Sequence, residues 1–307
     1  MQLIHRATEL LVGGRSVCLA IGVFDGVHLG HQQIISQTIA QARQHKGLAL
    51  VVTFDQHPST IVAPEKVPPL IYSTTQKLRT IQALGADALL VLRFDRAFSR
   101  QTGEAFIRQL ARDLARLQSI CVGADFVFGH QRSGNVALLL ELGSELHFTV
   151  HGIAAVSLDG QVVSSTRIRE ALRAGDFDGA GQMLGRAYSL TATVVEGDKL
   201  GSKLGFPTAN LDTTGFVLPP NGVYAAHATV GGQTHRAVVN IGQRPTLHQS
   251  VPQLRVEVHL LDYSGNLYGE EMEVGFATKL RNEQKFVSLD ELKAQIARDI
   301  AEARRRF

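Results

Sequence analysis

The first half of the chain alternates short, mostly apolar runs with longer amphipathic stretches. The apolar runs lie at 17–22, 48–54, 88–94, 119–123 and 146–153. The stretches whose apolar residues recur on one helical stripe lie at 31–45, 74–84, 102–117 and 134–143. Strands without a polar face are buried on both sides, as in a parallel sheet that helices cover. The alternation therefore predicts an α/β fold with a parallel sheet and helices on both of its faces.

Beyond residue 185 the helical periodicity gives way to short runs rich in Val, Thr and Tyr. Glycine-containing turns separate these runs, which lie at 188–197, 221–230, 235–242 and 253–263. Such runs predict an antiparallel sheet or a small β-barrel. One helix is expected to close the chain at 288–307, because Ser288 and Glu291 form a capping-box pattern at its start.

The change of pattern places a domain boundary near Arg186. Residues 166–186 have the pattern of two short helices split at Gly175. A chain of 307 residues is long enough for two domains of ordinary size. We therefore expect one domain at 1–185 and a second at 186–307.

Composition narrows the class of protein. The net charge is only +3 and both parts are near neutral, which is not the basic asymmetry of a nucleic-acid binder. No apolar run is long enough to span a membrane, and the first residues lack the pattern of a signal peptide. Cys18 and Cys121 lie inside apolar runs, which is typical of buried, reduced thiols. The chain is therefore expected to be cytoplasmic, without a membrane or nucleic-acid partner.

A glycine-rich turn, GVFDGVHLGH at 22–31, joins the first predicted strand to the first predicted helix. In open α/β sheets ligands bind at the carboxyl ends of the strands. A helix N-terminus at that edge offers free N–H groups to a phosphate. The turn has neither the Lys of a Walker A loop nor the spacing of G-x-G-x-x-G. His28 and His31 are therefore the side chains expected to contact a phosphate there.

The histidine pair allows three interpretations. The rings are metal ligands, although no third ligand is arranged around them. Alternatively, local backbone groups satisfy them and their role is structural. In the third interpretation, they donate hydrogen bonds to phosphoryl oxygens as charge develops at phosphorus. The surrounding glycines favour the third.

Motifs along nearly the whole chain resemble those of the bifunctional riboflavin kinase/FAD synthetase family. The turn is followed in the family's order by TFDQHP, VGADFVFGHQRSG and VSSTRIR. The motifs that resemble the kinase module are LGRAYSLTATVVEGDKLGSKLGFPTANL, LPPNGVYA, IGQRPT, VEVHLLDY, LYGE and LRNEQKF. The resemblance implies a Rossmann-like nucleotidylyltransferase domain and a riboflavin kinase barrel. It also implies that ATP phosphorylates riboflavin to FMN, and that a second ATP adenylylates FMN to FAD with release of pyrophosphate.

The resemblance assigns roles in the first module residue by residue. It makes His28 and His31 the adenylyltransferase histidines. The residues that it assigns to ATP and its phosphates are Gly22, Phe24, Gly26, Ser165, Thr166 and Arg169. Those that it assigns to the flavin cleft are Asp125, Phe126 and Phe128. Without it, Ser165 or Thr166 would be a helix N-cap, and the two phenylalanines would be core aromatics.

In the second module the resemblance implies that Thr208 and Asn210 hold Mg²⁺ bound to ATP, as oxygen ligands of a hard cation. A loop over the phosphates would contain Gly197, Gly201, Lys203 and Gly205. Glu257 matches the proposed base for the riboflavin hydroxyl, and Arg281 matches a loop that closes on the flavin. From alternation alone, Glu257 is an outward-facing strand residue between two valines.

Four positions depart from the family's frequent residues. They are Gln56, Asn135, Ala187 and Leu247, where the family often has proline, aspartate, proline and phenylalanine. None is a predicted catalytic residue, so both modules are expected to be active.

Three alternative functions remain open from sequence. In the first, one module is only a scaffold and the enzyme has a single activity. In the second, the chain is a flavin carrier without turnover. In the third, HLGH is the histidine motif of a class I tRNA-synthetase fragment. The phosphate-handling residues disfavour a carrier, and the lack of a KMSKS-like loop disfavours a synthetase. The expected ligands are riboflavin, FMN, FAD, ATP and Mg²⁺, with no tightly bound prosthetic group. A homo-oligomer is left open.

Overall fold

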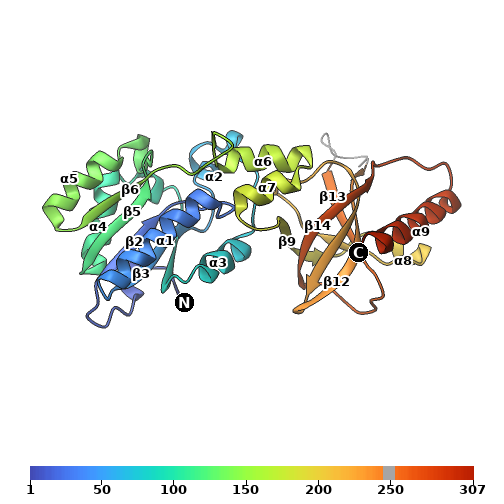
Figure 1. Cartoon of the computed structure of the whole chain (residues 1–307), viewed down its shortest axis with the longest axis horizontal. Coiled ribbons are helices and arrows are strands. Elements are labelled where there is room, and N and C mark those ends of the chain that lie inside the picture. The colour runs from blue at the N-terminus through green and yellow to red at the C-terminus, as the bar shows by residue number, and fades with distance from the viewer. Residues whose placement is uncertain (245–252) are drawn as a thin grey trace. The chain divides into compact units, whose positions relative to one another are not determined.

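The computed structural model describes residues 1–244 and 253–307. Contacts between Cα atoms divide the chain into two compact units (Figure 1). The first unit is Met1–Ser165 with Met183–Gly185, and the second is Thr166–Gln182 with Arg186–Phe307. Each unit has its own sheet and is described by itself.

The first unit contains a six-stranded parallel sheet. Its strands are β1 (Gln2–Ile4), β2 (Val17–Ile21), β3 (Leu48–Phe54), β4 (Ala88–Leu92), β5 (Leu117–Gly123) and β6 (Thr149–Ile153). They are ordered β1-β4-β3-β2-β5-β6, and each pair of neighbours is parallel. The predicted parallel sheet is therefore confirmed, with β2 near its centre.

Helices cover both faces of this sheet, as predicted. The main ones are α1 (Leu29–Gln44), α3 (Thr74–Ala83), α4 (Gly103–Leu114) and α5 (Val136–Leu146). Successive residues of β2 show the two faces: Ala20 packs in the cluster with α1 and α3, whereas Leu19 packs in the cluster with α4 and α5. A short helix α2 (Ser59–Val62) and a hairpin of β7 (Ser157–Leu158) and β8 (Gln161–Val162) complete the unit.

Several predicted boundaries in the first unit were wrong by two or three residues. The helix expected to run to residue 117 ends at Leu114, because Ala115 takes a left-handed conformation (φ 54°) and Leu117 joins β5. The next helix runs to Leu146, so the strand expected from 146 begins at Thr149.

The second unit contains a closed six-stranded antiparallel barrel. Its strands are β9 (Ser189–Val195), β10 (Ala209–Leu211), β11 (Gly222–Val230), β12 (Gln233–Arg244), β13 (Gln253–Leu260) and β14 (Glu271–Arg281). Their order around the barrel is β10-β13-β12-β11-β14-β9, and β9 pairs back to β10. The predicted barrel is confirmed, although β10 and β14 were not recognised as strands.

The barrel unit also carries helices. They are α8 (Leu200–Leu204), α9 (Leu289–Arg306) and most of α6 (Ser165–Ala174) and α7 (Phe177–Leu184). Ser288 caps α9 as expected, because its hydroxyl accepts from the backbone N–H of Glu291 at 3.2 Å. The Glu291 carboxylate accepts from the N–H of Val287 at 3.4 Å, so the pattern closes one residue earlier than a regular capping box. The apolar face of α9 packs on β11 and β12 around Val223 and Val238.

Helix α7 joins the barrel unit through one aromatic side chain. The Phe177 ring stacks on the Phe276 ring at 5.1 Å and on the Tyr188 ring at 6.4 Å between centroids. It also meets Tyr224 edge-on at 5.9 Å. The contacts of α6 and α7 thus lie mostly with the barrel, while the sequence pattern counts 166–185 with the first domain. The boundary at Arg186 stays a prediction.

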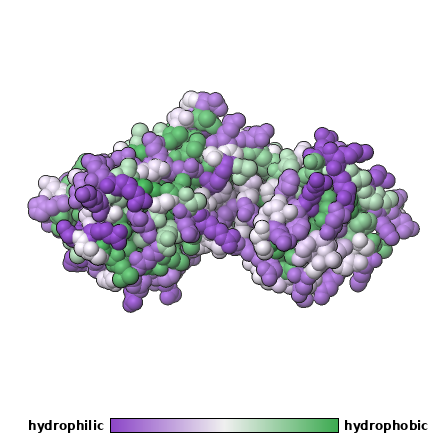
Figure 2. Space-filling model, turned by 60° about the horizontal axis from the view of Figure 1, so that its bottom comes forward, coloured by the Kyte–Doolittle hydropathy of each residue, from purple (hydrophilic) through white to green (hydrophobic). Residues whose placement is uncertain are grey.

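Both cysteines are fully buried and unpaired in the first unit, on neighbouring strands β2 and β5. Burial raises the pKa of the Cys121 thiol to about 11 and also raises that of Cys18. Within residues 1–244 and 253–307, no helix has the length and apolar character needed to cross a membrane. On the face shown in Figure 2, hydrophilic and hydrophobic residues are interspersed over both units.

Candidate active sites

The histidine turn follows the carboxyl end of β2, where the order of the sheet reverses. The chain passes from β2 to β3 on one side, while β5 pairs on the other side of β2. Open α/β sheets bind ligands at such a switch point. The turn ends at His28, which is the N-cap of α1.

The backbone of the turn is strained. Phe24 (φ 53°), Gly26 (φ 77°) and Val27 (φ 42°) all take left-handed conformations. Glycine adopts this region freely, but a bulky or β-branched residue does so at a cost of about 1–3 kcal/mol. Phe24 and Val27 are both buried, with 1% and 0% exposure, so packing holds them there. Strain of this kind is typical of functional turns.

The two histidine rings stack on each other in this turn. Their centroids are 3.6 Å apart at an interplanar angle of 20°, and the edge of Phe24 meets His31 at 5.3 Å. The Nδ1 atom of His28 accepts from the backbone N–H of His31 at 3.4 Å. Because Nδ1 is the acceptor, the neutral His28 ring carries its proton on Nε2. Gly30 makes room, since a Cβ there would lie 3.2 Å from the His28 ring.

Burial holds His31 in its neutral form. Its pKa lies well below the usual value, mainly because of desolvation, with His28 and Lys77 adding positive charge nearby. Its Nδ1 atom is buried without a hydrogen-bond partner among the described residues. A buried ring nitrogen without a partner is costly, and a ligand could offset that cost.

Lys77 of α3 connects the histidine turn to the end of β3 through hydrogen bonds. Its Nζ donates to the carbonyl of Val23 at 3.4 Å, the hydroxyl of Thr53 at 3.3 Å and the carbonyl of Phe54 at 3.1 Å. Burial lowers its pKa to about 8, although the Asp25 and Asp55 charges oppose the shift. A single buried amine thus links the first residues after β2 to the end of β3.

The serine motif reaches this turn. The Ser165 hydroxyl donates to the carbonyl of Asp25 at 3.0 Å, and the Asp25 carboxylate accepts from the N–H of Ile71 at 3.1 Å. Thr166 and Arg169 follow on α6 within the second unit, and Arg169 is buried. Their contact with ATP stays a prediction.

The predicted flavin residues follow β5, the neighbour of β2. Phe126 and Phe128 stack at 5.1 Å and pack against the core cluster of the α4–α5 face, while Asp125 is exposed. Because β2 and β5 are parallel, these residues and the histidine turn follow the same edge of the sheet. Partial burial in the core fits both the structural and the flavin-binding interpretation of the two phenylalanines.

The departures from the family have local explanations where the structure describes them. Gln56 donates from its amide to the Phe94 carbonyl at 2.8 Å. Asn135 caps α5, because its amide oxygen accepts from the Leu138 N–H at 2.9 Å. Ala187 is exposed, and Leu247 lies outside the described residues.

A cavity of about 350 Å³ lies in the barrel unit, on the face of the barrel that α9 partly covers. One part of its wall is apolar and comes from the barrel, α9 and the segment before it: Val223, Val238, Phe286, Leu292 and Ile296. The predicted site residues in its wall are Gly201, Thr208, Asn210, Glu257 and Arg281. A cavity of this size with an apolar and a polar part suits a small organic ligand.

Three predicted loop residues do not line this cavity. Gly197 instead lies against Asn210, whose amide a Cβ at that position would strike. Lys203 is exposed on α8, and Gly205 ends that helix with φ 90°. Contact of these residues with phosphate stays a prediction.

Glu257 lies in a row of polar residues across three strands. In the register of the barrel it is opposite Asn210 of β10 on one side and Asn240 of β12 on the other. Directly opposed residues project to the same side of a sheet. All three line the cavity, while Val256 and Val258 are buried on the other side. The expected alternation is confirmed, and the outward side is a cavity wall.

Sequence reasoning missed Asn240 and Asp299, which also line the cavity. Asn240 lies between buried Val239 and Ile241, and an amide within such an apolar run was a usable signal. Asp299 is buried and holds Arg281 through its guanidinium. Its position in a charged amphipathic helix gave no signal.

The donors present in the barrel fit a magnesium ion that arrives with ATP. Thr208 and Asn210 offer a hydroxyl and an amide oxygen in the cavity wall, and a hard cation completes its shell with phosphates and waters. Among the residues that the structure describes, no group of three or more His, Cys, Asp and Glu side chains could hold a metal. The metal interpretation of His28 and His31 therefore still has no third protein ligand there.

Together these features define a class of protein. One unit places a histidine-bearing, strained turn at the switch point of a parallel sheet, and the other places a carboxylate in the wall of a cavity on a closed barrel. A phosphate site at a helix N-terminus and a cavity with a carboxylate suit a two-module enzyme that handles phosphate groups and small organic molecules.

Comparisons with known proteins give the family. The family model of FAD synthetases matches residues 14–167, and that of riboflavin kinases matches residues 184–307. The bifunctional riboflavin kinase/FMN adenylyltransferase of Haemophilus influenzae is 37% identical over 100% of this chain and 99% of its own length. That of Escherichia coli is 39% identical over 100% and 98%. The chain belongs to the family of bifunctional riboflavin kinase/FMN adenylyltransferases.

The activity follows from this membership. The chain phosphorylates riboflavin to FMN and adenylylates FMN to FAD, with ATP as co-substrate of both steps. A crystal structure described as a macrolide-efflux protein from Streptococcus pneumoniae matches with a TM-score of 0.81 at 27% identity over 98% of both chains. That likeness supports the fold of the two units.

Proposed function

We propose that His28 and His31 carry the adenylyl transfer. An oxygen of the FMN phosphate attacks the α-phosphorus of ATP, the bond to the bridging oxygen breaks, and pyrophosphate leaves. The two rings donate to phosphoryl oxygens on which charge develops. The observation that carries this proposal is the stacked histidine pair in the strained turn at the N-terminus of α1.

The turn and its neighbours would bind the nucleotide. Gly22, Phe24 and Gly26 shape a backbone that a phosphate can approach, next to the N-terminus of α1. Ser165, Thr166 and Arg169 would hold the ATP phosphates. The residues after β5 that would line the flavin cleft are Asp125, Phe126 and Phe128.

We infer that Glu257 is the general base of the kinase. Its carboxylate would accept the proton of the terminal ribityl hydroxyl as that oxygen attacks the γ-phosphorus, and ADP leaves. The row Asn210–Glu257–Asn240 in the cavity wall supports this role. Magnesium bound with ATP would neutralise phosphate charge, and Thr208 and Asn210 would hold it there. Close approach of the Gly197 backbone to Asn210 fits a loop over the phosphates.

One protein preparation, assayed with riboflavin and then with FMN, tests both assignments. His28→Ala combined with His31→Ala should slow FAD formation about 100-fold or more, because preorganised donors are lost. Glu257→Gln keeps the shape but not the basicity, and should slow the kinase about 100-fold, since a loose transition state needs little proton removal. Each variant should leave the other activity at the parent rate.

One matched control lies at the end of α1 and the other on barrel strand β14. His45→Ala changes an exposed histidine at the opposite end of α1, and Glu273→Gln changes an exposed carboxylate on the barrel. Both should behave as the parent. Parent-like FAD synthesis by the histidine variant contradicts the first role, and parent-like kinase activity of Glu257→Gln contradicts the second. Zinc that is stoichiometric in the parent and lost in the histidine variant would favour the metal interpretation.

We also propose that the enzyme is cytoplasmic. The two buried, reduced thiols support a reducing compartment. Cell fractionation followed by the two assays tests this, and activity confined to an oxidising compartment would contradict it.

A further inference from the structure

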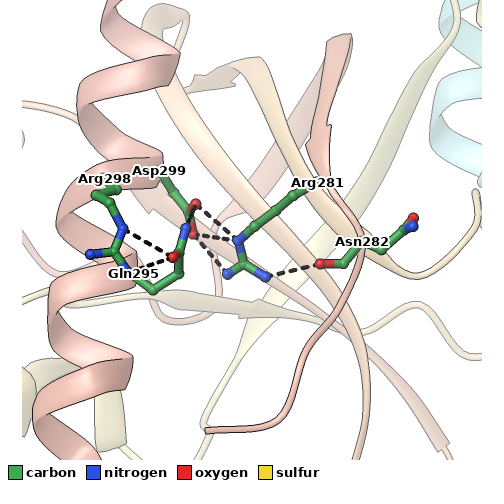
Figure 3. A network of polar contacts seen from close by, with 5 residues as sticks. All are labelled: Arg281, Asn282, Gln295, Arg298 and Asp299. Carbon is green, nitrogen blue, oxygen red and sulfur yellow. Dashed lines mark hydrogen bonds and ion pairs between the residues drawn. The ribbon is translucent and has the colours of Figure 1, made fainter.

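A buried ion pair connects β14 to α9 at the wall of the kinase cavity. Figure 3 shows the Arg281 guanidinium turned toward the Asp299 carboxylate. Its Nε lies 2.9 and 3.0 Å from the two carboxylate oxygens, and its Nη2 lies 2.8 Å from one of them. Its Nη1 donates to the Asn282 carbonyl at 3.0 Å. The side chain that sequence assigned to the flavin is therefore fixed by protein partners on two sides.

A second layer of contacts holds the carboxylate. The Gln295 amide donates to Asp299 at 2.8 Å, and the Gln295 oxygen accepts from Arg298 at 3.0 and 2.7 Å (Figure 3). The Asp299 side chain is only 7% exposed and that of Arg281 is 20% exposed. Bidentate contact between a guanidinium and a carboxylate fixes orientation as well as distance. Only the carboxylate is fully buried, and an ion pair of this kind is by itself weak evidence for stability.

The pair lies where orientation matters for a ligand. Arg281 and Asp299 both line the cavity, next to the apolar part of its wall formed by Leu292, Ile296 and Phe286. The Arg281 guanidinium carbon lies 5.9 Å from the centroid of the Phe286 ring. Thr208, Asn210 and Glu257 supply the polar part. A planar, largely apolar ring system fits the part beside α9, and phosphates fit the polar part.

We propose that Asp299, supported by Gln295, is a positioning residue for riboflavin. It holds Arg281 in one orientation and fixes α9 to β14, so that the apolar part of the cavity is preformed for the flavin ring. This inference rests on the proposed assignment of the cavity to riboflavin. A preformed wall reduces the ordering that binding would otherwise require. The pair therefore acts on riboflavin affinity rather than on the phosphoryl-transfer step.

The test compares Asp299→Asn with the parent in the full chain. The amide keeps the shape but loses the charge that Arg281 requires. We expect the KM for riboflavin to rise about 10-fold while kcat falls less than about 3-fold, the pattern of lost binding that is uniform along the reaction. The KM for ATP and the conversion of supplied FMN to FAD should stay at parent values. A fluorescence titration with riboflavin should show the same loss of affinity without turnover.

A second ion pair of α9 provides the matched control. Arg304 binds Asp262 at 2.6 Å, also joining α9 to the barrel, but both side chains are exposed and neither lines the cavity. Asp262→Asn should leave the KM for riboflavin unchanged. Gln295→Ala leaves the buried pair intact and removes only its support. If Asp299→Asn does not fold, Gln295→Ala still tests the inference, with an expected rise of about 2- to 5-fold in the KM for riboflavin.

The outcomes distinguish the positioning role of Asp299 from the assignment of the cavity to riboflavin. A folded Asp299→Asn or Gln295→Ala with the parent KM for riboflavin overturns the positioning role. A fall in kcat at unchanged KM, together with a lower melting temperature, points to a merely structural pair and also overturns it. If Glu257→Gln retains full kinase activity, the assignment of the cavity is wrong, and this result does not depend on Asp299.

Discussion

Lys77 shows how one residue couples the sheet to the histidine turn. Its buried amine reaches the Val23 carbonyl in the turn and the Phe54 carbonyl at the end of β3. Hydrogen bonds from a charged donor contribute about 1.5–3 kcal/mol each, so this contact opposes the cost of burying the amine. The residue thereby keeps the strained turn anchored to the strands.

Lys77→Met should slow adenylyl transfer about 10-fold, because a small displacement of positioning groups is costly to rate. It should also change the pH dependence of unfolding. The pKa is about 8 when folded and 10.5 in the reference state, so between these values the unfolded chain binds more protons. The stability of the parent should therefore rise with pH from 8 to 10.5 relative to the variant. Thermal unfolding of both proteins across this range checks the sign.

Kinase activity of Lys77→Met should match the parent. Parallel stability profiles of the two proteins between pH 8 and 10.5 would contradict a buried, perturbed amine at this position.

Local sequence carried the information for the histidine site. His28 and His31 lie within a single ten-residue stretch between a predicted strand and a predicted helix. The turn could therefore be predicted from local sequence. The contacts of Glu257 with the residues beside it depend on the register of three strands. The Arg281–Asp299 pair depends on where α9 docks. Pattern within one segment does not determine register or docking, so Asp299 was missed. Asn240 was missed although its amide within an apolar run was a usable local signal.

At the scale of elements, α9 is both a cover for the barrel and a wall of the kinase cavity. Its N-cap is Ser288, and the preceding Val287 is 91% exposed. The first turn of the helix is thus held by its cap more than by packing. Leu292, at the end of this turn, lines the cavity.

Ser288→Ala should destabilise α9 by about 1 kcal/mol, the usual cost of losing such a cap. Because the first turn lies beside the cavity, the KM for riboflavin should rise about 2-fold while FAD synthesis from FMN is unchanged. Hydrogen exchange at Leu289–Leu292 and the two assays measure this. Ser288→Asp retains a capping oxygen and should restore the parent values. Identical exchange rates in Ser288→Ala and Ser288→Asp would contradict a stabilising role of the cap.

Elements were predicted well where periodicity was unbroken and poorly where pairing overrode it. The helical period continues past Leu114, but Leu117 pairs in register with Val17 of β2 and the chain must extend. Strand β14 is an exception, because it was missed although its sequence alternates from Met272 to Leu280, with an apolar residue or threonine at every second position. Its pairing with β11 shifts register at two places, and neither shift can be read from the sequence pattern.

At the scale of the whole molecule, the two units should be separable. A fragment of residues 187–307 contains the whole barrel and α9, and should phosphorylate riboflavin. It lacks Phe177, whose ring stacks on Tyr188 and Phe276. A fragment of residues 166–307 retains that contact and should be more stable by about 2 kcal/mol, the order of a lost, partly buried aromatic side chain.

Circular dichroism melting of both fragments, with riboflavin kinase assays, checks this prediction. Phe177→Ala in the longer fragment should reduce its melting temperature toward that of the shorter one. Unfolded fragments at every boundary tried would show that the barrel depends on the first unit and would contradict the proposed division at Arg186.

The two buried cysteines allow opening of the first unit to be measured by thiol labelling. Both thiols of the chain lie in β2 and β5, and the barrel has none. A thiol reagent can therefore react only when the central strands beside the histidine turn separate from the helices that cover them. The labelling rate therefore measures how often the sheet of the adenylyltransferase unit opens, and it does not report on the barrel. No cysteine needs to be introduced. Adding ATP or FMN should slow the labelling, whereas a riboflavin analogue that binds only the barrel should leave it unchanged.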